Sequence, residues 1–457
     1  MPKLVSTNPG KNYEVVGEVD ISSDAEIKEK VNSANKAKLS WKELGLKKRI
    51  ALMRRVYEEF EKRKDQFPTL ITNETGKPIS QSRSEVEGSL EDFQWFLDNG
   101  ENALQDEVTY KDGASLHRIV YEPYGTAAVI TPWNFPLNMF IWGVIPNLIA
   151  GNVAVFKISE ECPLAGKLIE KVMESGNLPD GVFSEVYGAG DVGQKLAESD
   201  INLIWFTGST KVGKLLYKIA AEKFIKVLLE LGGSSPAVVF EDVDVSDIVP
   251  ELYCERFSNC GQVCDSVKRL IVHESIFEEV VARLKEEAEK KILGSPADER
   301  TDIGSLVAER QLVLLQSQVK DAVEKCATVI TGGKSPANLK GAYYEPTLLT
   351  NITREMRVWK EEVFGPVLPI VPFKTEEEAV KLANDTVYGL GSRVYSKDIA
   401  RAERVASKIQ AGTVEINHAS RWQTAKNPFG GFKNSGMGRD LGIQGFHELC
   451  QIKLVAR

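Results

Sequence analysis

The chain has 457 residues, of which 42% are hydrophobic and 27% are charged, and its formal net charge is −8. A chain of this length exceeds one typical hydrophobic core, so we expect two or three domains. The acidic balance argues against nucleic acid or a membrane surface as a general partner. The sequence has no apolar run long enough to span a membrane, and its first residues lack the apolar region of a signal peptide, so we expect a cytoplasmic protein.

The N-terminal quarter is predicted to be mainly helical. Residues 1–22 favour a short strand-rich segment, and Ser23 is a candidate cap for a helix that runs to about Ser40. Long amphipathic helices are expected over residues 46–105.

A hairpin should follow these helices. Residues 107–114 predict a first strand that turns at Asp112-Gly113, and residues 116–121 predict the second strand. A hairpin that projects from a helical region has unpaired edges, which must be covered. We expect another subunit to cover them, in a homodimer or homotetramer.

From residue 123 to residue 240, short apolar runs alternate with helical segments, which is typical of a parallel sheet with crossover helices. This pattern is compatible with a dinucleotide-binding architecture. The strand candidates are residues 126–130, 153–156, 184–187, 203–206 and 237–240.

Two glycine patterns in this region need separate interpretation. Residues 188–193 match Gly-x-Gly-x-x-Gly, which is weak evidence in a chain with 36 glycines. Residues 208–214 resemble a P-loop, but Leu215 stands where the magnesium-binding Ser or Thr should be, which excludes a nucleotide triphosphatase. Ser209 can instead cap a helix whose free amides face an anion.

A second α/β unit is expected from about residue 241 to residue 432, with a long helix over residues 276–292. The tail after residue 433 should return towards the first domain. It should end in a strand over residues 451–456, which we expect to pair with the hairpin in an oligomer.

The candidate nucleophile is Cys264, because residues 257–266 set this thiol among small and polar residues instead of an apolar core run. A cysteine attacks only as thiolate, so it needs a nearby base or positive field and room for a carbonyl group. Gly261 supplies the room. If Cys264 is considered alone, the alternative is that it is a small buried hydrophobic residue with no catalytic role.

Two upstream residues can complete a catalytic set with this thiol. Glu230 follows the apolar run 225–229, which places a carboxylate at a buried strand end, where burial raises its pKa and suits a general base. Asn134 lies between Pro132 and Pro136, and a rigidly held amide can donate to a developing oxyanion. When each residue is taken separately, the alternative for Glu230 is a salt-bridged surface acid and the alternative for Asn134 is a turn residue between prolines.

Taken together and in this order, these segments resemble the aldehyde dehydrogenase superfamily over nearly the whole chain. The motifs that carry the resemblance are residues 123–125 leading to 131–136, then 206–209, 229–233, 261–264, 361–366 and 428–436. The resemblance implies an α/β fold with a Rossmann-like parallel-sheet cofactor domain, a second α/β catalytic domain and a small β oligomerisation element. The implied boundaries are 1–105 and 122–231 for the cofactor domain, with 433–446 returning to it, 232–432 for the catalytic domain, and 106–121 with 447–457 for the oligomerisation element.

The resemblance also implies the chemistry, which is oxidation of an aldehyde through a cysteine thiohemiacetal and thioester. Cys264 is the implied nucleophile, and Glu230 is the implied general base that activates water. Asn134 and the backbone amide of Cys264 form the implied oxyanion hole.

A nicotinamide dinucleotide is the implied cofactor. Lys157 and Glu160 would hold the adenosine ribose, and because Glu160 would repel a 2′-phosphate, the sequence favours NAD over NADP. Glu362 and Phe364 are similar to the family's contacts to the nicotinamide ribose and ring. The full set of implied cofactor residues is Thr131, Pro132, Trp133, Lys157, Ser159, Glu160, Gly190, Phe206, Gly208, Ser209, Leu231, Gly232, Glu362 and Phe364.

The substrate is predicted to be a small aldehyde. Residues 445–450 and the compact length resemble the succinate-semialdehyde dehydrogenase branch, and a distal carboxylate needs a cation. Residues 138–143 contain no cation, so Arg421 or Lys426 would have to supply it. Alternatively, Phe140, Trp142 and Trp422 would line an apolar pocket for a neutral or hydroxy aldehyde.

The presence of Glu230 bears on the fate of the thioester. An enzyme that passes the acyl group to CoA is less favoured, because Glu230 is retained and suits hydrolysis. A silent member of the fold would be expected to lose Cys264 or Glu230, and both stand in this sequence.

The cysteines and histidines lack the spacings of metal ligands or of a disulfide framework, so we expect neither. Cys260 could form a redox-sensitive pair with Cys264, although an inert packed thiol is favoured. The residues concerned are Cys162, Cys254, Cys260, Cys264, Cys326 and Cys450, and His117, His273, His418 and His447.

Overall fold

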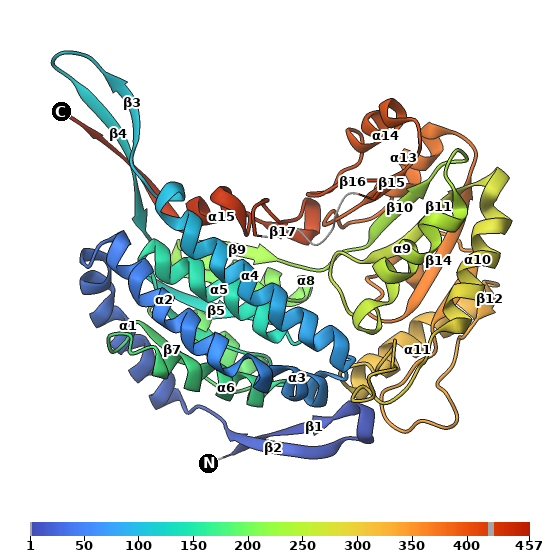
Figure 1. Cartoon of the computed structure of the whole chain (residues 1–457), viewed down its shortest axis with the longest axis horizontal. Coiled ribbons are helices and arrows are strands. Elements are labelled where there is room, and N and C mark those ends of the chain that lie inside the picture. Colours follow the sequence, from blue (N-terminus) through green and yellow to red (C-terminus); the bar gives the residue numbers. More distant parts are fainter. Residues whose placement is uncertain (1, 419–424) are drawn as a thin grey trace.

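The computed structural model describes residues 2–418 and 425–457 of the chain (Figure 1). The chain begins with an antiparallel pair, β1 (Lys3–Asn8) and β2 (Glu14–Asp20). Helix α1 (Asp24–Glu43) starts directly after Ser23, whose hydroxyl oxygen accepts a hydrogen bond from the amide of Glu26. The predicted strand-rich start and the predicted cap are therefore confirmed.

Three further helices fill the region up to residue 103, as the amphipathic pattern predicted. They are α2 (Leu46–Arg63), α3 (Phe67–Thr75) and α4 (Ile79–Ala103). Helix α4 packs along α2, α3 and α5 (Pro136–Ala150). At its start, Glu85 on α4 accepts a hydrogen bond from the amide of Leu137 at 3.1 Å, in the first turn of α5.

The first sheet has the strand order β17-β9-β8-β5-β6-β7. Its strands are parallel except for β17, which pairs antiparallel with β9. Each central strand is buried on both faces, which is why these strands read as continuous apolar runs. The strands are β5 (Thr126–Ile130), β6 (Val153–Lys157), β7 (Phe183–Glu185), β8 (Leu203–Thr207), β9 (Lys226–Glu230) and β17 (Gly436–Met437), and the crossover helices besides α5 are α6 (Pro163–Ser175), α7 (Gly190–Glu198) and α8 (Thr210–Lys223).

The second sheet has the strand order β12-β13-β14-β11-β10-β15-β16. The strand predicted at residues 237–240 exists as β10, but it pairs with β11 and β15 in this sheet and not with the strands before it. The two glycines at 232–233 separate β9 from β10 and let the chain pass from one sheet to the other. The strands are β10 (Ser235–Val239), β11 (Val267–His273), β12 (Thr328–Thr331), β13 (Thr347–Thr350), β14 (Val367–Phe373), β15 (Arg393–Tyr395) and β16 (Glu415–Ile416).

Helices cover both faces of this second sheet. The helix predicted over residues 276–292 is present as α10. The helices are α9 (Val245–Phe257), α10 (Phe277–Lys290), α11 (Glu309–Glu324), α12 (Arg357–Lys360), α13 (Glu376–Asn384) and α14 (Ile399–Ala406); short 3-10 turns are η1 (Pro9–Lys11), η2 (Lys64–Gln66), η3 (Ser258–Gly261), η4 (Glu274–Ile276) and η5 (Lys433–Ser435).

The hairpin projects from one corner of the molecule in Figure 1. Strands β3 (Glu107–Lys111) and β4 (Leu116–Pro123) pair antiparallel, and the carboxylate of Asp112 in their turn accepts from two backbone amides. The C-terminal strand β18 (Cys450–Ala456) follows α15 (Gly442–Glu448) and pairs with β4 over its whole length. The expectation that this strand meets the hairpin in an oligomer is corrected here, because the pairing lies within one chain.

The two large sheets have separate hydrophobic cores, one around β5, β6 and β8 and others on the faces of the second sheet. This arrangement confirms the predicted α/β fold with a Rossmann-like parallel sheet and a second α/β unit. The domain boundaries remain a prediction. In the described residues, no helix combines the length and the apolar character needed to cross a membrane.

Candidate active site

The three predicted catalytic residues come from separate elements that meet at one place. Cys264 lies between η3 and β11, Glu230 is the last residue of β9, and Asn134 lies in the turn between β5 and α5. The Glu230 carboxyl is close enough to Cys264 to raise the pKa of its thiol, and Asn134 contacts the main chain two residues before Cys264. The structure therefore brings all three together.

Asn134 is held through both its side-chain amide and its main-chain oxygen. Its Nδ2 donates to the main-chain oxygen of Gln262 across 3.1 Å, and its own main-chain oxygen accepts from Asn259 Nδ2 at 2.9 Å. Because a side-chain amide carries two N–H donors, one remains for an oxyanion. Gln262 also braces the loop, because its Oε1 accepts from the amide of Val307 at 3.0 Å.

The loop that carries the thiol has an unusual backbone. Asn259 and Cys260 adopt left-handed φ angles of 51° and 55°, and Gly261 has φ 72°. A Cβ atom on Gly261 would lie 2.4 Å from the main-chain oxygen of Gly365. The glycine therefore lets this loop pack against the segment after α12. Asn259 and Gln262, which were not predicted as site residues, hold the loop there.

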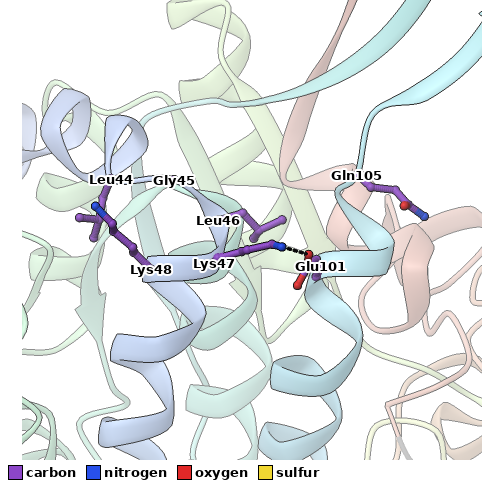
Figure 2. A pocket seen from close by; sticks show the side chains of 7 residues that line it. All are labelled: Leu44, Gly45, Leu46, Lys47, Lys48, Glu101 and Gln105. Carbon is purple, nitrogen blue, oxygen red and sulfur yellow. Dashed lines mark ion pairs between the residues drawn. The ribbon is translucent and has the colours of Figure 1, made fainter.

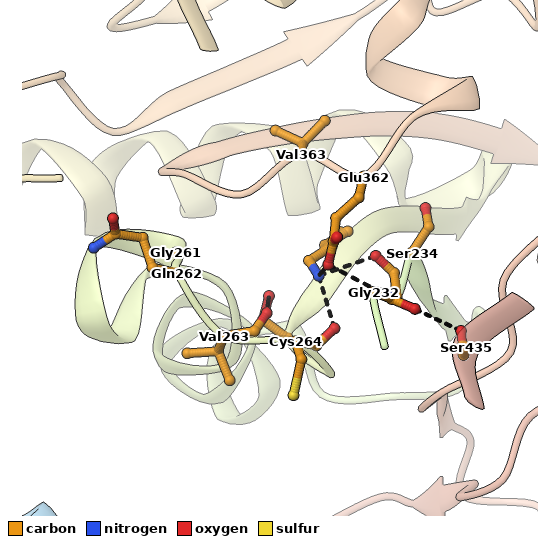
Figure 3. Close-up of polar contacts among 12 residues, drawn as sticks. Gly232, Ser234, Gly261, Gln262, Val263, Cys264, Glu362, Val363 and Ser435 are labelled. Carbon is orange, nitrogen blue, oxygen red and sulfur yellow. Dashed lines mark hydrogen bonds and ion pairs between the residues drawn. The ribbon is translucent and has the colours of Figure 1, made fainter. Parts of the chain in front are cut away.

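Cys264 is half-buried, and burial is the main cause that raises the pKa of its thiol. The neighbouring carboxylates of Asp265, Glu362 and Glu230 raise this pKa further, whereas Lys268 lowers it. The resting thiol is therefore protonated, so a base or a positive charge must help to form the thiolate. Figure 3 shows Cys264 beside the Glu362 side chain and the polar contacts around them.

Lys268 was not predicted from the sequence, yet its positive charge lowers the pKa of the Cys264 thiol. Its side chain is buried on β11, and its Nζ donates to the main-chain oxygens of Gly233 at 3.0 Å and Cys264 at 2.7 Å. It also forms an ion pair with Glu362 at 2.7 Å. Its local sequence does not single it out, because Lys268 stands beside Arg269 in the buried strand β11.

Glu230 is 3% exposed and lies at a buried strand end, as predicted. In the described residues neither carboxyl oxygen has a hydrogen-bond partner. Burial raises the pKa of Glu230 well above its ordinary value, the nearby Asp440 raises it further, and Arg439 lowers it. A buried carboxyl without partners can take a proton from a water molecule that enters the site.

Asp440 and Gly430 shape the space around Glu230 and were both missed as site residues. Asp440 is buried, its Oδ1 accepts from Trp205 Nε1 at 2.7 Å, and burial raises its pKa. A Cβ atom on Gly430 would lie 2.8 Å from Glu230 Oε1, so a larger residue would press on the carboxyl. Both come from the segment after the second sheet that returns to β9.

The predicted phosphate-binding residues lie at the start of α8. Ser209 caps this helix, because its Oγ accepts from the amide of Val212, which confirms the predicted cap. Gly208 donates its amide to the main-chain oxygen of Glu230 and packs against the Phe206 ring. Leu231 is buried beside this helix start, since a Cβ on Gly213 would lie 2.4 Å from its side chain.

The predicted adenosine-ribose residues lie at the end of β6 and directly after it. Lys157 is buried, which lowers its pKa, and its Nζ lies 3.7 Å from the Glu160 carboxylate. Ser159 accepts from the amide of Glu161, and Arg310 on α11 lies 3.9 Å from Glu160. Gly190 opens α7 at the surface.

The predicted nicotinamide residues face one another across the two units. The Trp133 and Phe364 rings meet edge to face at 5.6 Å, and the Glu362 carboxylate touches Gly232, where a Cβ atom would lie 2.3 Å from Glu362 Oε2. Thr131, next to Pro132, donates its amide to the main-chain oxygen of Lys157.

Two buried hydroxyls at this sheet edge, Thr131 Oγ1 and Thr207 Oγ1, lack partners in the described residues. A capped helix start, close-packed glycines and unpaired hydroxyls at the carboxyl ends of parallel strands fit a dinucleotide.

The predicted substrate residues are only partly described. Arg421, and the alternative pocket residue Trp422, lie outside the described residues. Lys426 is exposed. Phe140 does not line a pocket, because it is fully buried and packs on Phe156 in the core of the first unit, which corrects that alternative.

Trp142 is held by a buried carboxylate. Its Nε1 donates to Asp92 Oδ2 at 2.7 Å, and its ring lies 5.6 Å from the Phe429 ring. Asp92 also accepts from Asn138 Nδ2 at 3.1 Å and from the amide of Ala425 at 3.0 Å. Phe429 directly precedes Gly430, the glycine next to Glu230 Oε1, so this aromatic pair lies close to Glu230 along the chain.

Cys260 is buried and free, and burial raises the pKa of its thiol to about 12. Such a thiol is inert at neutral pH, which favours the packed role over a redox pair.

A hollow on the surface lies apart from this site. It is lined by the α1–α2 turn and by the end of α4, and Lys47 and Glu101 form an ion pair across it at 3.1 Å (Figure 2). None of the predicted site residues lines it. We assign no function to it.

The sequence matches the model of the aldehyde dehydrogenase family over residues 2–455. It is 36% identical to a succinate-semialdehyde dehydrogenase [NADP(+)] of Deinococcus radiodurans, covering 94% of this chain and 90% of that protein. It is 35% identical to aminoaldehyde dehydrogenase 1, peroxisomal, of Pisum sativum, covering 100% of this chain and 92% of that protein.

The fold is also similar to that of solved structures. An NAD-dependent aldehyde dehydrogenase from Sinorhizobium meliloti superposes with a TM-score of 0.96 at 33% identity. The match covers 100% of this chain and 91% of that one.

Proposed function

Because the chain belongs to the aldehyde dehydrogenase family, we propose that it oxidises an aldehyde to a carboxylic acid with NAD or NADP. The observation that carries this proposal is the meeting of Cys264, Asn134 and Glu230 around one loop. A nucleophile, an amide donor and an unpaired buried carboxyl are the groups that acyl chemistry on a thiol requires.

The reaction begins when the Cys264 thiolate attacks the aldehyde carbon and forms a thiohemiacetal. Asn134 Nδ2 and the Cys264 amide donate to the oxyanion. A bound nicotinamide would supply the hydride acceptor, and loss of a hydride from the thiohemiacetal carbon gives the thioester. Glu230 then takes a proton from water, the hydroxide attacks the thioester carbon, and the carboxylic acid leaves as the Cys264 thiolate is released.

We propose that Thr131, Lys157, Glu160, Ser209 and Glu362 hold the cofactor with their neighbours. NAD remains the favoured cofactor, because the Glu160 carboxylate would repel a 2′-phosphate. Arg310, which lies 3.9 Å from Glu160 and forms an ion pair with Glu161 at 2.7 Å, is the nearby cation that supports NADP as the second candidate. The Deinococcus radiodurans relative is named for NADP(+).

Hydrolysis is favoured over transfer to CoA. Glu230 is buried near the thiol, and its carboxyl oxygens have no hydrogen-bond partner in the described part of the chain. A carboxyl in this state is available to bind and activate a water molecule. Retention of both Cys264 and Glu230 also disfavours a silent member of the fold.

Succinate semialdehyde is one candidate substrate, supported by the Deinococcus radiodurans relative. Its distal carboxylate needs a cation, which Arg421 or Lys426 would supply.

A neutral or cationic aldehyde is the second candidate, and the Asp92 carboxylate favours it. The three groups that contact Asp92 are all N–H donors, which favour the ionised carboxylate against the burial that raises its pKa, and they fix the Trp142 ring against Phe429. An aromatic wall backed by a negative charge suits an uncharged or positively charged chain better than a second carboxylate.

The experiment is a comparison of initial rates of NADH and NADPH formation by the purified protein. The substrates are succinate semialdehyde, lactaldehyde, an aminoaldehyde and an uncharged aliphatic aldehyde. A higher kcat/KM for succinate semialdehyde supports a cation in the pocket. A higher kcat/KM for the others supports the Asp92 wall, and no activity with any aldehyde would overturn the proposal.

We further propose that the protein acts in the cytoplasm as a homodimer or homotetramer. The three-stranded sheet of β18, β4 and β3 supports an assembly, because Ile452, Leu454 and Val108 on it are exposed apolar side chains. The domain division at residues 231–232 and 432–433 is part of the same proposal. Light scattering of the purified protein would test the assembly.

A further inference from the structure

Lys268 is a buried cation with every donor engaged. Its side chain is 1% exposed, and its ammonium group donates to Gly233 O, Cys264 O and Glu362 Oε1. An ammonium group has three donors, so these contacts saturate it. A buried charge is retained only when it is paired and hydrogen-bonded, and Glu362 provides the opposite charge.

The contacts of Lys268 join two parts of the site that the chain separates by about a hundred residues. One contact is to the main chain of Cys264, and another is to Glu362, on the segment after α12. Glu362 is held at the same time by the amide of Gly233, which donates to its Oε1 at 3.0 Å. Lys268 therefore holds the Glu362 carboxylate near the Cys264 main chain. Figure 3 shows Glu362 and Cys264 on the two segments that this contact joins.

The charges around the thiol are mostly negative. Asp265, Glu362 and Glu230 face Cys264, and Lys268 opposes them; Arg256 on α9 is the other cation that acts on Lys268 itself. Burial lowers the pKa of Lys268, and the Glu362 carboxylate raises it. The Lys268–Glu362 ion pair therefore keeps both groups charged. Lys268 lowers the pKa of the Cys264 thiol, and Glu362 raises it.

We propose that Lys268 is a positioning residue for the reaction, which fixes Glu362 against the Cys264 main chain and favours the thiolate of Cys264 by its charge. This rests on the proposed function of Cys264 as the nucleophile. Lys268 touches neither substrate nor reacting atoms, so its effect passes through Glu362 and Cys264.

The test is the pH dependence of alkylation of Cys264 by iodoacetamide in the purified full chain, with the labelled peptide identified by mass spectrometry. Lys268→Met should move the midpoint upward by about one pH unit, because a cation near a thiol lowers its pKa by that order. Glu362→Gln should move it downward by about one unit, because it removes an anion. If the two substitutions only loosened the loop, the alkylation midpoints of both variants would move in the same direction.

Two further readouts separate positioning from simple loss of folding. Lys268→Met should also raise KM for NAD about tenfold, since Glu362 loses its main partner, and Lys268→Arg should restore part of both effects. Lys285→Met, an exposed lysine on α10, is the control. If Lys268→Met does not fold, the proposal is judged on the alkylation midpoint of Glu362→Gln alone.

The proposal is overturned if the Lys268→Met midpoint stays or falls, or if the Glu362→Gln midpoint stays or rises. Failure of the proposed function looks different. In that case Cys264→Ser keeps its activity, while the alkylation midpoint of Cys264 still reports on Lys268.

Discussion

The side-chain amide of Asn134 donates to the main-chain oxygen of Gln262 across 3.1 Å. This bond and the one from Asn259 Nδ2 to the main-chain oxygen of Asn134 connect the turn after β5 to the loop that carries the thiol, so they position the oxyanion donor relative to the nucleophile. The side-chain oxygen of Gln262 in turn accepts a hydrogen bond from the amide of Val307.

Asn134→Ala should lower kcat by about 10²- to 10³-fold, because one oxyanion donor is lost. KM for NAD should change little, since Asn134 makes no predicted contact to the cofactor. Steady-state rates of NADH formation measure both. Asn99→Ala, whose amide contacts the Trp95 main chain in the same helix, is the matched control, and an unchanged kcat in Asn134→Ala would contradict the assignment.

Cys264→Ser should abolish aldehyde oxidation, by at least about a thousandfold, because a hydroxyl is a far weaker nucleophile than a thiolate. NAD binding, followed by quenching of tryptophan fluorescence, should be nearly intact. Cys254→Ser, which changes an exposed cysteine on α9, should keep full activity. Activity that survives in Cys264→Ser would rule this residue out as the nucleophile.

Glu230→Gln should stall the reaction at the thioester. A rapid burst of about one NADH per site should be followed by slow turnover, since no base remains to activate water. Mass spectrometry of the quenched enzyme should find the acyl group on Cys264. Turnover at the unaltered rate would show that another group activates water.

Asp440→Asn should shift the acid side of the kcat profile to lower pH by about one unit. Glu230 is active as a base only when ionised, and Asp440 raises its pKa, so removing this anion lowers the pKa of Glu230. The asparagine Oδ1 can still accept from Trp205. The measurement is kcat against pH for both proteins, and a shift to higher pH would contradict the electrostatic role.

Asp92→Asn should raise kcat/KM for succinate semialdehyde relative to an uncharged aldehyde of similar length. The substitution keeps an acceptor for Trp142 but removes the negative charge behind the aromatic wall. A change of about tenfold in the ratio corresponds to one screened charge interaction. An unchanged ratio would mean that Asp92 only supports the Trp142 ring.

Much of the fold could be predicted from local sequence. The buried strands β5, β6 and β8 appear as continuous apolar runs because both faces of a parallel sheet are covered. Ser23 and Ser209 mark helix starts because a hydroxyl satisfies a free amide.

The candidate catalytic residues also have local signals. Glu230 follows an apolar run, and Asn134 lies between two prolines. The roles of Cys264 as nucleophile, Glu230 as base and Asn134 as oxyanion donor are not predicted by these local signals. They are implied by the order of motifs along the whole chain, which resembles one family.

Contacts between residues far apart in sequence become visible only in the folded chain. Lys268 in the buried strand β11, Asp440 near Glu230, and Asp92 bonded to Trp142 have no local pattern that marks them. The strand β10 and the residue Phe140 were misjudged for the same reason, since apolarity predicts burial but not the sheet or core in which a residue is buried. Periodicity along the chain reports which face a residue presents, whereas its partners depend on how the two sheets and the returning C-terminal segment pack together.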